Sequence, residues 1–283
     1  MKIGVTGATG QLGRLVVQEL LKSVSAQDIV AIVRNAAKAA DLVAEGVVVR
    51  VAPYDDPAAL QAALAGVERL LLISSSEVGQ RVQQHQNVID AAKAAGVQFI
   101  AYTSAPMAAT TTLILAPDHK ATEELLFNSG IDFAILRNNW YTENYLQQLN
   151  TARQTGKVVA AAGEGQVASA SRADYAAGAA AVLLDGGHVG RIYELGGDYA
   201  WTYDELAAAI GEVIGQHVTY EPVDAPTLIE ILQSVGLDEG TAGFVAALDT
   251  NIAAGVLSEV THDLSRLIGR PTTPLVDGLR AAL

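Results

Sequence analysis

The sequence of 283 residues contains no cysteine. This absence excludes disulfide bonds, thiolate nucleophiles and the cysteine ligation of iron–sulfur clusters. Histidine is also scarce, and no two of its five copies stand at a spacing typical of metal ligands: His85, His119, His188, His217 and His262. We therefore expect no metal site.

Positive charge is the second shortage, because 18 Lys and Arg residues stand against 31 Asp and Glu residues, for a formal net charge of -13. A protein this acidic is not expected to bind nucleic acid directly through nonspecific electrostatic attraction. The sequence also lacks an apolar run long enough to cross a membrane, and its start lacks the basic and apolar segments of a secretory signal. We expect a cytoplasmic protein that binds no membrane.

Apolar, β-branched segments alternate with amphipathic helical patterns through the first half of the chain. The strands are expected at residues 2–6, 28–33, 47–51, 69–74, 97–103 and 131–137, and the helices near 12–23, 36–45, 57–65, 79–95 and 118–129. Glycines placed just before the next strand, at 46, 66, 96 and 130, are typical helix stops. The alternation predicts an α/β fold with a doubly wound (Rossmann) parallel sheet.

The rhythm changes after residue 140, which indicates a second domain. We expect residues 1–140 to form a Rossmann domain, with segments within about 157–200 returning to it. Residues 201–283 are expected to form a smaller, mostly helical domain on the substrate side, interleaved with 141–156. From Tyr220 onward the pattern predicts only helices and loops.

Three glycines follow the first expected strand in the stretch Gly7-Ala8-Thr9-Gly10-Gln11-Leu12-Gly13. Gly7 suits a tight turn, Gly10 allows the backbone to approach a pyrophosphate, and Gly13 allows the helix to pack closely. The N-terminus of the following helix offers N–H groups to an anion. A tight turn without a ligand is the alternative, but the strand before and the helix after favour a dinucleotide site.

Arg34 is the residue that discriminates between the two nicotinamide cofactors. It stands 21 residues after Gly13 at the end of the second strand, where a fold selective for NAD places an acid on the ribose 2′-hydroxyl. An arginine there suits the 2′-phosphate of NADP instead, and Asn35 and Lys38 add donors. A solvated arginine at a strand end is the alternative; we favour NADP.

Other polar residues follow the strands at the same edge of the sheet, where ligands of open α/β sheets bind. Asp55 and Asp56 suit the adenine amino group, but an aspartate cap on the helix starting near Pro57 explains either equally well. The Ser74-Ser75-Ser76 segment suits the ribose and diphosphate of a cofactor or, equally, a helix N-cap. Thr103 and Ser104 are expected near the nicotinamide, in a positioning role rather than a catalytic one.

Two further groups have a structural and a functional interpretation. His119 and Glu123 stand four residues apart on one helix face and suit a pair facing the site, although an exposed charge network at the helix start is the favoured interpretation. Ser171 and Asp174 resemble a capping box, and we treat them as structural.

The whole sequence resembles the NmrA-like group of atypical short-chain dehydrogenases, and within it the bacterial NADPH:quinone oxidoreductases of type 2. The matching stretches include VTGATGQLG, IVAIVRN, LLLISSSEVGQR, AAKAAGVQFIAYTS, LRNNWYTENY, ASASRADYAA and LIGRPTT. Triphenylmethane dye reductases are relatives that share several of them. The segment 105–117 and Lys120 depart most from the pattern.

The resemblance implies a set of residues that contact NADP: Gly7, Ala8, Thr9, Gly10, Gln11, Leu12, Arg34, Ser74, Ser75, Ser76, Arg137, Asn138, Asn139, Trp140, Tyr141 and Thr142. It also implies a quinone over the nicotinamide, in a cleft between the domains. No residue is identified as catalytic, and the candidates for positioning the substrate are Asn138, Trp140, Tyr141, Ser104 and His119.

The Tyr-x-x-x-Lys pair of typical short-chain dehydrogenases is missing, since Ala116 stands four residues before Lys120. Reduction of a ketone, which needs a positioned acid, is therefore disfavoured. A quinone is more electrophilic, and hydride positioning alone suffices for it.

The expected function is direct hydride transfer from NADPH to a quinone or similar conjugated acceptor, without flavin or metal. An NADP-binding redox sensor without turnover and a triphenylmethane dye reductase are the alternatives, and a homodimer is left open.

Overall fold

The structure, a computed structural model, describes residues 1–77 and 79–283. Contacts within the chain group these residues into two compact units. The first unit comprises Met1–Ala109, Pro117–Asn138 and Arg172–Glu194, and the second comprises Thr110–Ala116, Asn139–Ser171 and Leu195–Leu283.

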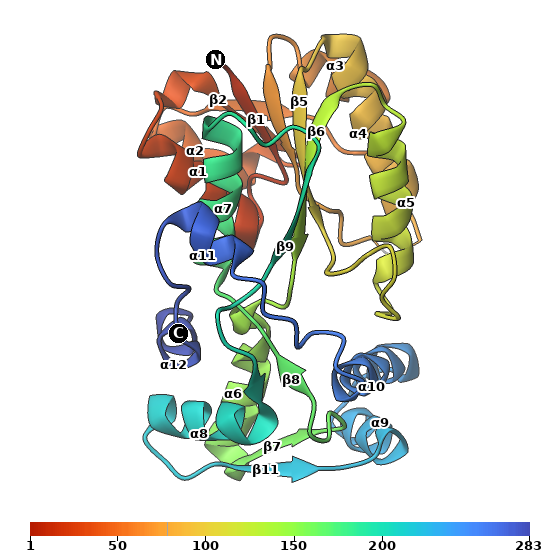
Figure 1. Cartoon of the computed structure of the whole chain (residues 1–283), viewed down its shortest axis with the longest axis vertical. Helices are drawn as coiled ribbons and strands as arrows, with labels where there is room; N and C mark the ends of the chain where they lie inside the picture. Colours follow the sequence, from red (N-terminus) through yellow and green to blue (C-terminus); the bar gives the residue numbers. More distant parts are fainter. Residues whose placement is uncertain (78) are drawn as a thin grey trace. The chain divides into compact units, whose positions relative to one another are not determined.

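A seven-stranded sheet in the order β3-β2-β1-β4-β5-β6-β9 forms the centre of the first unit (Figure 1). Its strands are β1 (Ile3–Thr6), β2 (Ile29–Val33), β3 (Val48–Val51), β4 (Arg69–Leu72), β5 (Phe99–Ser104), β6 (Asp132–Asn138) and β9 (Arg191–Leu195). Strands β1 to β6 pair in parallel, with Val5 opposite both Ala31 and Leu71. The order confirms the doubly wound sheet expected from the sequence.

Helices cover both faces of this sheet (Figure 1). They are α1 (Gln11–Leu21), α2 (Ala40–Ala44), α3 (Pro57–Ala63), α4 (Arg81–Ala95), α5 (Ala116–Phe127) and α7 (Arg172–Leu184), with short 3-10 turns η1 (Ala26–Asp28) and η2 (Ala36–Ala39). Helix α1 packs against α7, and α3 packs against α4. The fully buried patterns of β1, β2 and β5 follow from this double cover, because neither face meets water.

The four glycines expected to stop helices all adopt positive φ, from 75° to 86°. L-amino acids with a side chain rarely adopt this conformation, so these positions end one element and turn the chain toward the next strand. The prediction of helix ends at 46, 66, 96 and 130 is confirmed.

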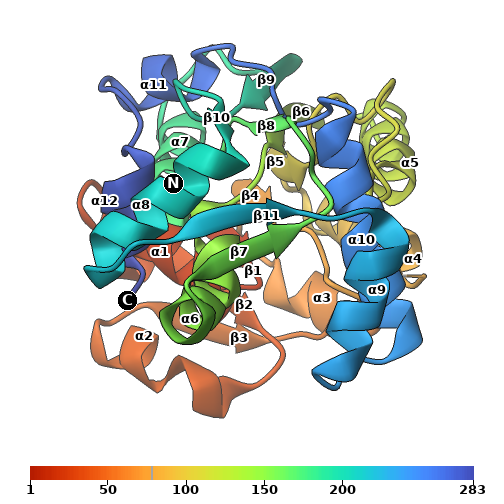
Figure 2. The ribbon, with the colours of Figure 1, turned by 90° about the horizontal axis from the view of Figure 1, so that it is seen from below.

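The second unit contains two small sheets and the remaining helices (Figure 2). The elements are η3 (Thr142–Tyr145), α6 (Leu146–Thr155), β7 (Lys157–Ala160), β8 (Gln166–Val167), β10 (Trp201–Thr202), α8 (Tyr203–Ile214), β11 (Thr219–Pro222), α9 (Ala225–Ser234), α10 (Glu239–Ala253), α11 (Asp263–Ile268) and α12 (Leu275–Ala281). Strands β7 and β11 pair in parallel, while β8 and β10 pair antiparallel. Helix α8 packs against β11, and α9 against α10.

Strand β11 corrects one expectation, because we predicted only helices and loops from Tyr220 onward. Its sequence, Thr-Tyr-Glu-Pro, is half exposed and has no apolar run. The strand exists because the backbone of 219–222 pairs with 157–160, a long-range contact that the local sequence does not reveal.

The segment that returns to the main sheet is Arg172–Glu194, which lies inside the range of about 157–200 expected from the sequence. Residues 157–171, by contrast, belong to the second unit, where β7 pairs with β11. In the described part of the chain, no helix has the length and apolar character needed to cross a membrane.

Candidate functional site

The glycine loop joins β1 to α1, and each glycine in it has a separate physical reason. Gly7 adopts φ +59°, the left-handed turn, and its carbonyl accepts a 2.8 Å hydrogen bond from the Gly10 N–H. Gly10 is the N-cap of α1 with extended backbone. A Cβ on Gly13 would lie 2.3 Å from the Gly7 oxygen, so only glycine lets the helix begin this close to the loop.

A cleft of about 570 Å³ lies in the first unit beside this loop. The ends of β1, β2 and β4 and the segment after β3 all contribute to it. It brings together several residues expected at the cofactor: Gly7, Thr9, Gly10, Arg34, Asn35, Lys38, Asp55, Ser74, Ser75 and Ser76. The strand ends that the sequence analysis expected at one edge of the sheet therefore do line a common cleft.

The cleft also contains residues that the sequence analysis gave no role: Ile32, Ala52, Pro53, Tyr54, Ile73, Glu77 and Gln84. The Tyr54 hydroxyl donates a 2.9 Å hydrogen bond to the Ile73 carbonyl and also bonds Thr6. Burial raises the pKa of Tyr54, so it stays a neutral phenol at physiological pH. Its place just after β3 was the signal that identifies it as a lining residue.

Arg34 points into the cleft with a side chain that is 71% exposed, and its Nη1 lies 2.6 Å from Glu77 Oε1. The neighbouring Asn35 is the N-cap of η2, because its side chain accepts a hydrogen bond from the Ala37 N–H. Arg34 is thus neither buried nor simply solvated.

The two aspartates after β3 have different positions. Asp56 caps α3 by accepting a 2.9 Å hydrogen bond from the Ala59 N–H, with Pro57 in the first turn. The alternative interpretation, in which an aspartate caps the helix, is therefore confirmed for Asp56. Asp55 instead lines the cleft.

The three serines do not cap the next helix, because α4 begins at Arg81 after an N-cap at Gln80. The capping alternative for Ser74 to Ser76 is therefore wrong. The Ser74 N–H donates to Thr103 Oγ1 at 2.9 Å, which fixes the first serine to β5.

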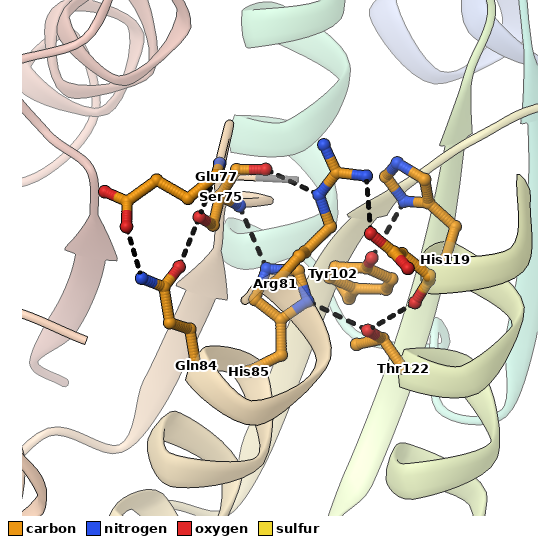
Figure 3. A network of polar contacts seen from close by, with 9 residues as sticks. Ser75, Glu77, Arg81, Gln84, His85, Tyr102, His119 and Thr122 are labelled. Carbon is orange, nitrogen blue, oxygen red and sulfur yellow. Dashed lines mark hydrogen bonds and ion pairs between the residues drawn. The ribbon is translucent and has the colours of Figure 1, made fainter. Parts of the chain in front are cut away.

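Ser75 is held through its backbone by two buried side chains (Figure 3). Its N–H donates to His85 Nε2 at 2.9 Å, and its carbonyl accepts from Arg81 Nε at 2.6 Å. Because His85 Nε2 accepts from a backbone N–H, the ring carries its proton on Nδ1, which bonds Thr122 Oγ1 at 2.9 Å. Burial lowers the pKa of His85 to about 3, so the ring is neutral.

His119 belongs to the same buried layer, with Nδ1 2.8 Å from the Tyr102 hydroxyl (Figure 3). Burial lowers the pKa of His119 to about 3 and raises the pKa of Tyr102. A tyrosine in this environment is a poor source of protons. Thr122, which lies with His119 on α5, donates a hydrogen bond from its hydroxyl to the Asp118 carbonyl. The Asp118 Oδ2 atom lies 3.4 Å from Arg81 Nη1.

Glu123 is buried and contacts Arg137 rather than water. Arg137 donates to both Glu123 oxygens, at 2.9 and 2.6 Å, and to Glu194 at 2.7 Å. Ser104 donates to Glu123 at 2.6 Å. The interpretation of this helix start as an exposed charge network is wrong for His119 and Glu123, because α5 packs them into the unit interior.

The Arg137 guanidinium is therefore committed to two carboxylates, which raise its pKa. It does not line the cleft beside the glycine loop. Its expected contact with the cofactor stays a prediction.

The residues at the end of β6 and after it are divided between the units. Asn138, the last residue of β6, belongs to the first unit, whereas Asn139, Trp140, Tyr141 and Thr142 belong to the second. There the Asn139 amide donates to the Leu257 carbonyl at 3.1 Å, and Thr142 Oγ1 lies 2.9 Å from Ser169 Oγ. The expected roles of these residues stay predictions.

The remaining residues of the glycine loop differ in exposure. Ala8 and Leu12 have buried side chains, and Gln11 is exposed. Only the backbone of Ala8 and Leu12 is therefore available to a ligand. Among the described residues, no group of three His, Asp or Glu side chains is arranged to hold a metal ion.

Comparison with known proteins identifies the family. Residues 7–186 match the family described as NAD(P)H-binding. The chain belongs to this family. It is 53% identical over 277 residues to quinone oxidoreductase 2 of Escherichia coli strain K12. The matched stretch covers 98% of this chain and 97% of the relative.

Two solved structures agree with this assignment. The crystal structure of NADPH-dependent quinone oxidoreductase 2 from Escherichia coli, complexed with NADPH, superposes with a TM-score of 0.95 at 53% identity and covers 99% of both chains. Triphenylmethane reductase from Citrobacter sp., complexed with NADP(H), superposes with a TM-score of 0.95 at 41% identity over 100% of both chains. The resemblance stated from the sequence is thereby confirmed.

Proposed function

We propose that this protein is an NADPH-dependent reductase that transfers hydride directly to a quinone or a similar conjugated acceptor, without flavin or metal. The observation that carries the proposal is the 53% identity, over 98% of the chain, with quinone oxidoreductase 2 of Escherichia coli. An identity this high across both units supports a shared activity as well as a shared fold.

The cleft of the first unit fits the cofactor. A Cβ on Gly10 would lie 3.1 Å from the Gly7 oxygen and would occupy space at the helix start where a pyrophosphate must approach. The first turn of α1 has N–H groups without helical acceptors, and its dipole favours an anion. In this proposal Gly7, Thr9 and Gly10 hold the diphosphate.

Other residues that line the cleft suit the adenosine half of the cofactor. Arg34 and Lys38 supply two cations for the 2′-phosphate, and Asp55 lines the same cleft. Ser74 to Ser76 border the ribose and diphosphate. When bound, NADPH supplies the hydride, and the residues of this chain orient it and exclude water.

We assign positioning of the substrate to Asn138, the last residue of β6, and to Trp140 and Tyr141, which follow it. Ser104 and His119, the other two candidates, are engaged with Glu123 and Tyr102. An aromatic wall stabilises a flat acceptor by roughly 0.5–1.5 kcal/mol, and orientation contributes more through effective molarity.

Reduction of triphenylmethane dyes is a second candidate, favoured by the 41% identity with the Citrobacter reductase over the whole chain. Such dyes are conjugated acceptors of hydride, as quinones are. The two activities are separated by the acceptor that supports the larger kcat/KM.

The test is NADPH oxidation by the purified protein, without added flavin, with a simple benzoquinone and in parallel with a triphenylmethane dye. Faster turnover with the quinone supports the main proposal, and faster turnover with the dye supports the second candidate. Binding of NADP without turnover of either acceptor contradicts both and favours a redox sensor. A cytoplasmic location and a homodimer are part of the proposal, tested by cell fractionation and light scattering.

A further inference from the structure

Glu77 holds the arginine that the proposed function assigns to the 2′-phosphate. Both residues line the same cleft, although 43 residues separate them, and the Arg34 Nη1 to Glu77 Oε1 distance is 2.6 Å. The Arg34 side chain is 71% exposed and that of Glu77 is 40% exposed, so an arriving anion has access to the pair.

The Glu77 carboxylate is also held from its other side, so its position is not that of a loose surface residue. Its Oε2 accepts a 2.7 Å hydrogen bond from Gln84 Nε2, and its N–H donates to Ser75 Oγ at 3.1 Å (Figure 3). Gln84 Oε1 in turn accepts from Ser75 Oγ. One carboxylate oxygen thus accepts from Gln84 of α4, and the other contacts Arg34.

A carboxylate and a phosphate compete for the same donors of a guanidinium. Both accept charge-assisted hydrogen bonds from Arg34, and two anions placed on one exposed arginine repel each other. A 2′-phosphate that binds next to this pair therefore meets the negative charge of Glu77 and competes with it for Nη1 of Arg34, whereas an uncharged 2′-hydroxyl meets no such repulsion.

We propose that Glu77 is a specificity-determining residue that competes with the cofactor's 2′-phosphate for Arg34 and so limits the affinity for NADP(H). The inference rests on the proposed function in that it takes Arg34 as the phosphate ligand. Its consequence is that the oxidised cofactor leaves more readily than from an arginine without a competitor. Lys38, the second cation assigned to the 2′-phosphate, and Asp55 also line the cleft.

The test measures the dissociation constants of NADP+ and NAD+ by calorimetry in four forms: wild type, Glu77→Gln, Arg34→Ala and the double variant. Glutamine keeps the size of the side chain and an acceptor for Gln84, and it removes the charge that holds Arg34. Loss of one exposed ion pair predicts that Glu77→Gln binds NADP+ about threefold to fivefold more tightly. Binding of NAD+ stays within about twofold of wild type, and the gain for NADP+ disappears in the Arg34→Ala background.

Asp55→Asn is the matched control, since it removes a second carboxylate from the same cleft. We expect it to shift both dissociation constants together and to leave their ratio unchanged. Thermal melting of each variant without cofactor shows whether the fold is retained.

Four outcomes overturn the inference. They are equal effects of Glu77→Gln on NADP+ and NAD+, weaker binding of NADP+, unchanged binding of NADP+, and the same gain with Arg34 removed. Tight binding of NADP+ without turnover of any acceptor contradicts the proposed activity alone, because these affinities need no reaction. Failure of the wild type to bind NADP+ overturns the proposed function and the inference together.

Discussion

The Tyr102 hydroxyl lies 2.8 Å from His119 Nδ1, and both side chains are buried inside the first unit. His85 lies beside Tyr102 with its ring edge-on, at a centroid distance of 5.4 Å. Two histidines that the fold keeps neutral therefore lie behind the serine segment, where burial lowers the pKa of each to about 3.

The first prediction concerns acid stability. Between the folded pKa of about 3 and the ordinary value of 6.5, the unfolded chain binds protons that the folded chain excludes. Stability therefore falls as the pH drops from 6.5, by about 1.4 kcal/mol per pH unit for each histidine. Urea unfolding between pH 6.5 and 4.5 measures this slope. His85→Gln keeps an acceptor for Ser75 and should make the slope shallower; an unchanged slope contradicts the assignment.

The second prediction concerns Asp249 in the second unit, which accepts a 2.8 Å hydrogen bond from the Ala161 N–H. Burial raises the pKa of Asp249 to about 6. Here the folded chain retains a proton that the unfolded chain loses, so stability decreases as the pH rises from 3.8 to 6. Asp249→Asn keeps an acceptor and should raise the free energy of unfolding at pH 7.5 by about 1–3 kcal/mol. This increase in the free energy of unfolding should vanish below pH 4. An increase that does not depend on pH would show that the charge of Asp249 is not its cause.

The third prediction concerns cofactor preference. Arg34→Ala should reduce the kcat/KM ratio of NADPH to NADH by roughly tenfold to a hundredfold, because a charge-assisted hydrogen bond to phosphate contributes about 1.5–3 kcal/mol. Arg280→Ala, an exposed arginine of the second unit that also forms ion pairs, is the control and should leave the ratio unchanged. An unchanged ratio in Arg34→Ala means that the 2′-phosphate is bound elsewhere.

The fourth prediction compares two glycines of one loop. Gly10 has negative φ and its added Cβ would meet only the Gly7 oxygen at 3.1 Å, so Gly10→Ala should fold and bind NADPH weakly. Gly13→Ala would place a Cβ 2.3 Å from the same oxygen, and should lower stability by about 1–3 kcal/mol. Thermal melts and NADPH titrations of both variants separate the two effects. Wild-type affinity in Gly10→Ala would show that the pyrophosphate avoids this loop.

The fifth prediction is that no single side chain acts as an obligatory general acid. A dedicated acid contributes about 10²–10⁴-fold to kcat. We expect Tyr102→Phe, Tyr141→Phe, His119→Gln and Lys120→Gln, each tested alone, to lower kcat with a quinone by less than about tenfold. A loss of roughly a thousandfold in one of them, with NADPH binding intact, would reveal a proton donor and restore carbonyl reduction as a candidate.

Much of the fold and of the cleft was predictable because the signals are local. A glycine loop between a strand and a helix fixes the first βα turn, and the carboxyl ends of parallel strands lie at one edge by geometry alone. Arg34 and Ser74 to Ser76 were placed in one cleft on that reasoning, and the structure finds them there.

What escaped prediction depends on contacts between distant segments. Nothing in the local sequence of His119 and Glu123 shows that α5 packs them inward, and their polarity suggested the opposite. The partner of Arg137 was equally hidden, since Glu194 stands 57 residues later in the chain. Burial and pairing of this kind are properties of tertiary packing, which overrides local preference.

The first unit is built from three separate stretches of the chain, and this has a consequence for its synthesis. Strands β1 to β6 are complete at residue 138, but α7, which packs against α1, is not translated until residues 172–184. While the ribosome adds the 33 residues of 139–171, helix α1 has no α7 to pack against. The nascent chain is most exposed to aggregation during that interval, and a translational pause or a chaperone would act there with the greatest effect.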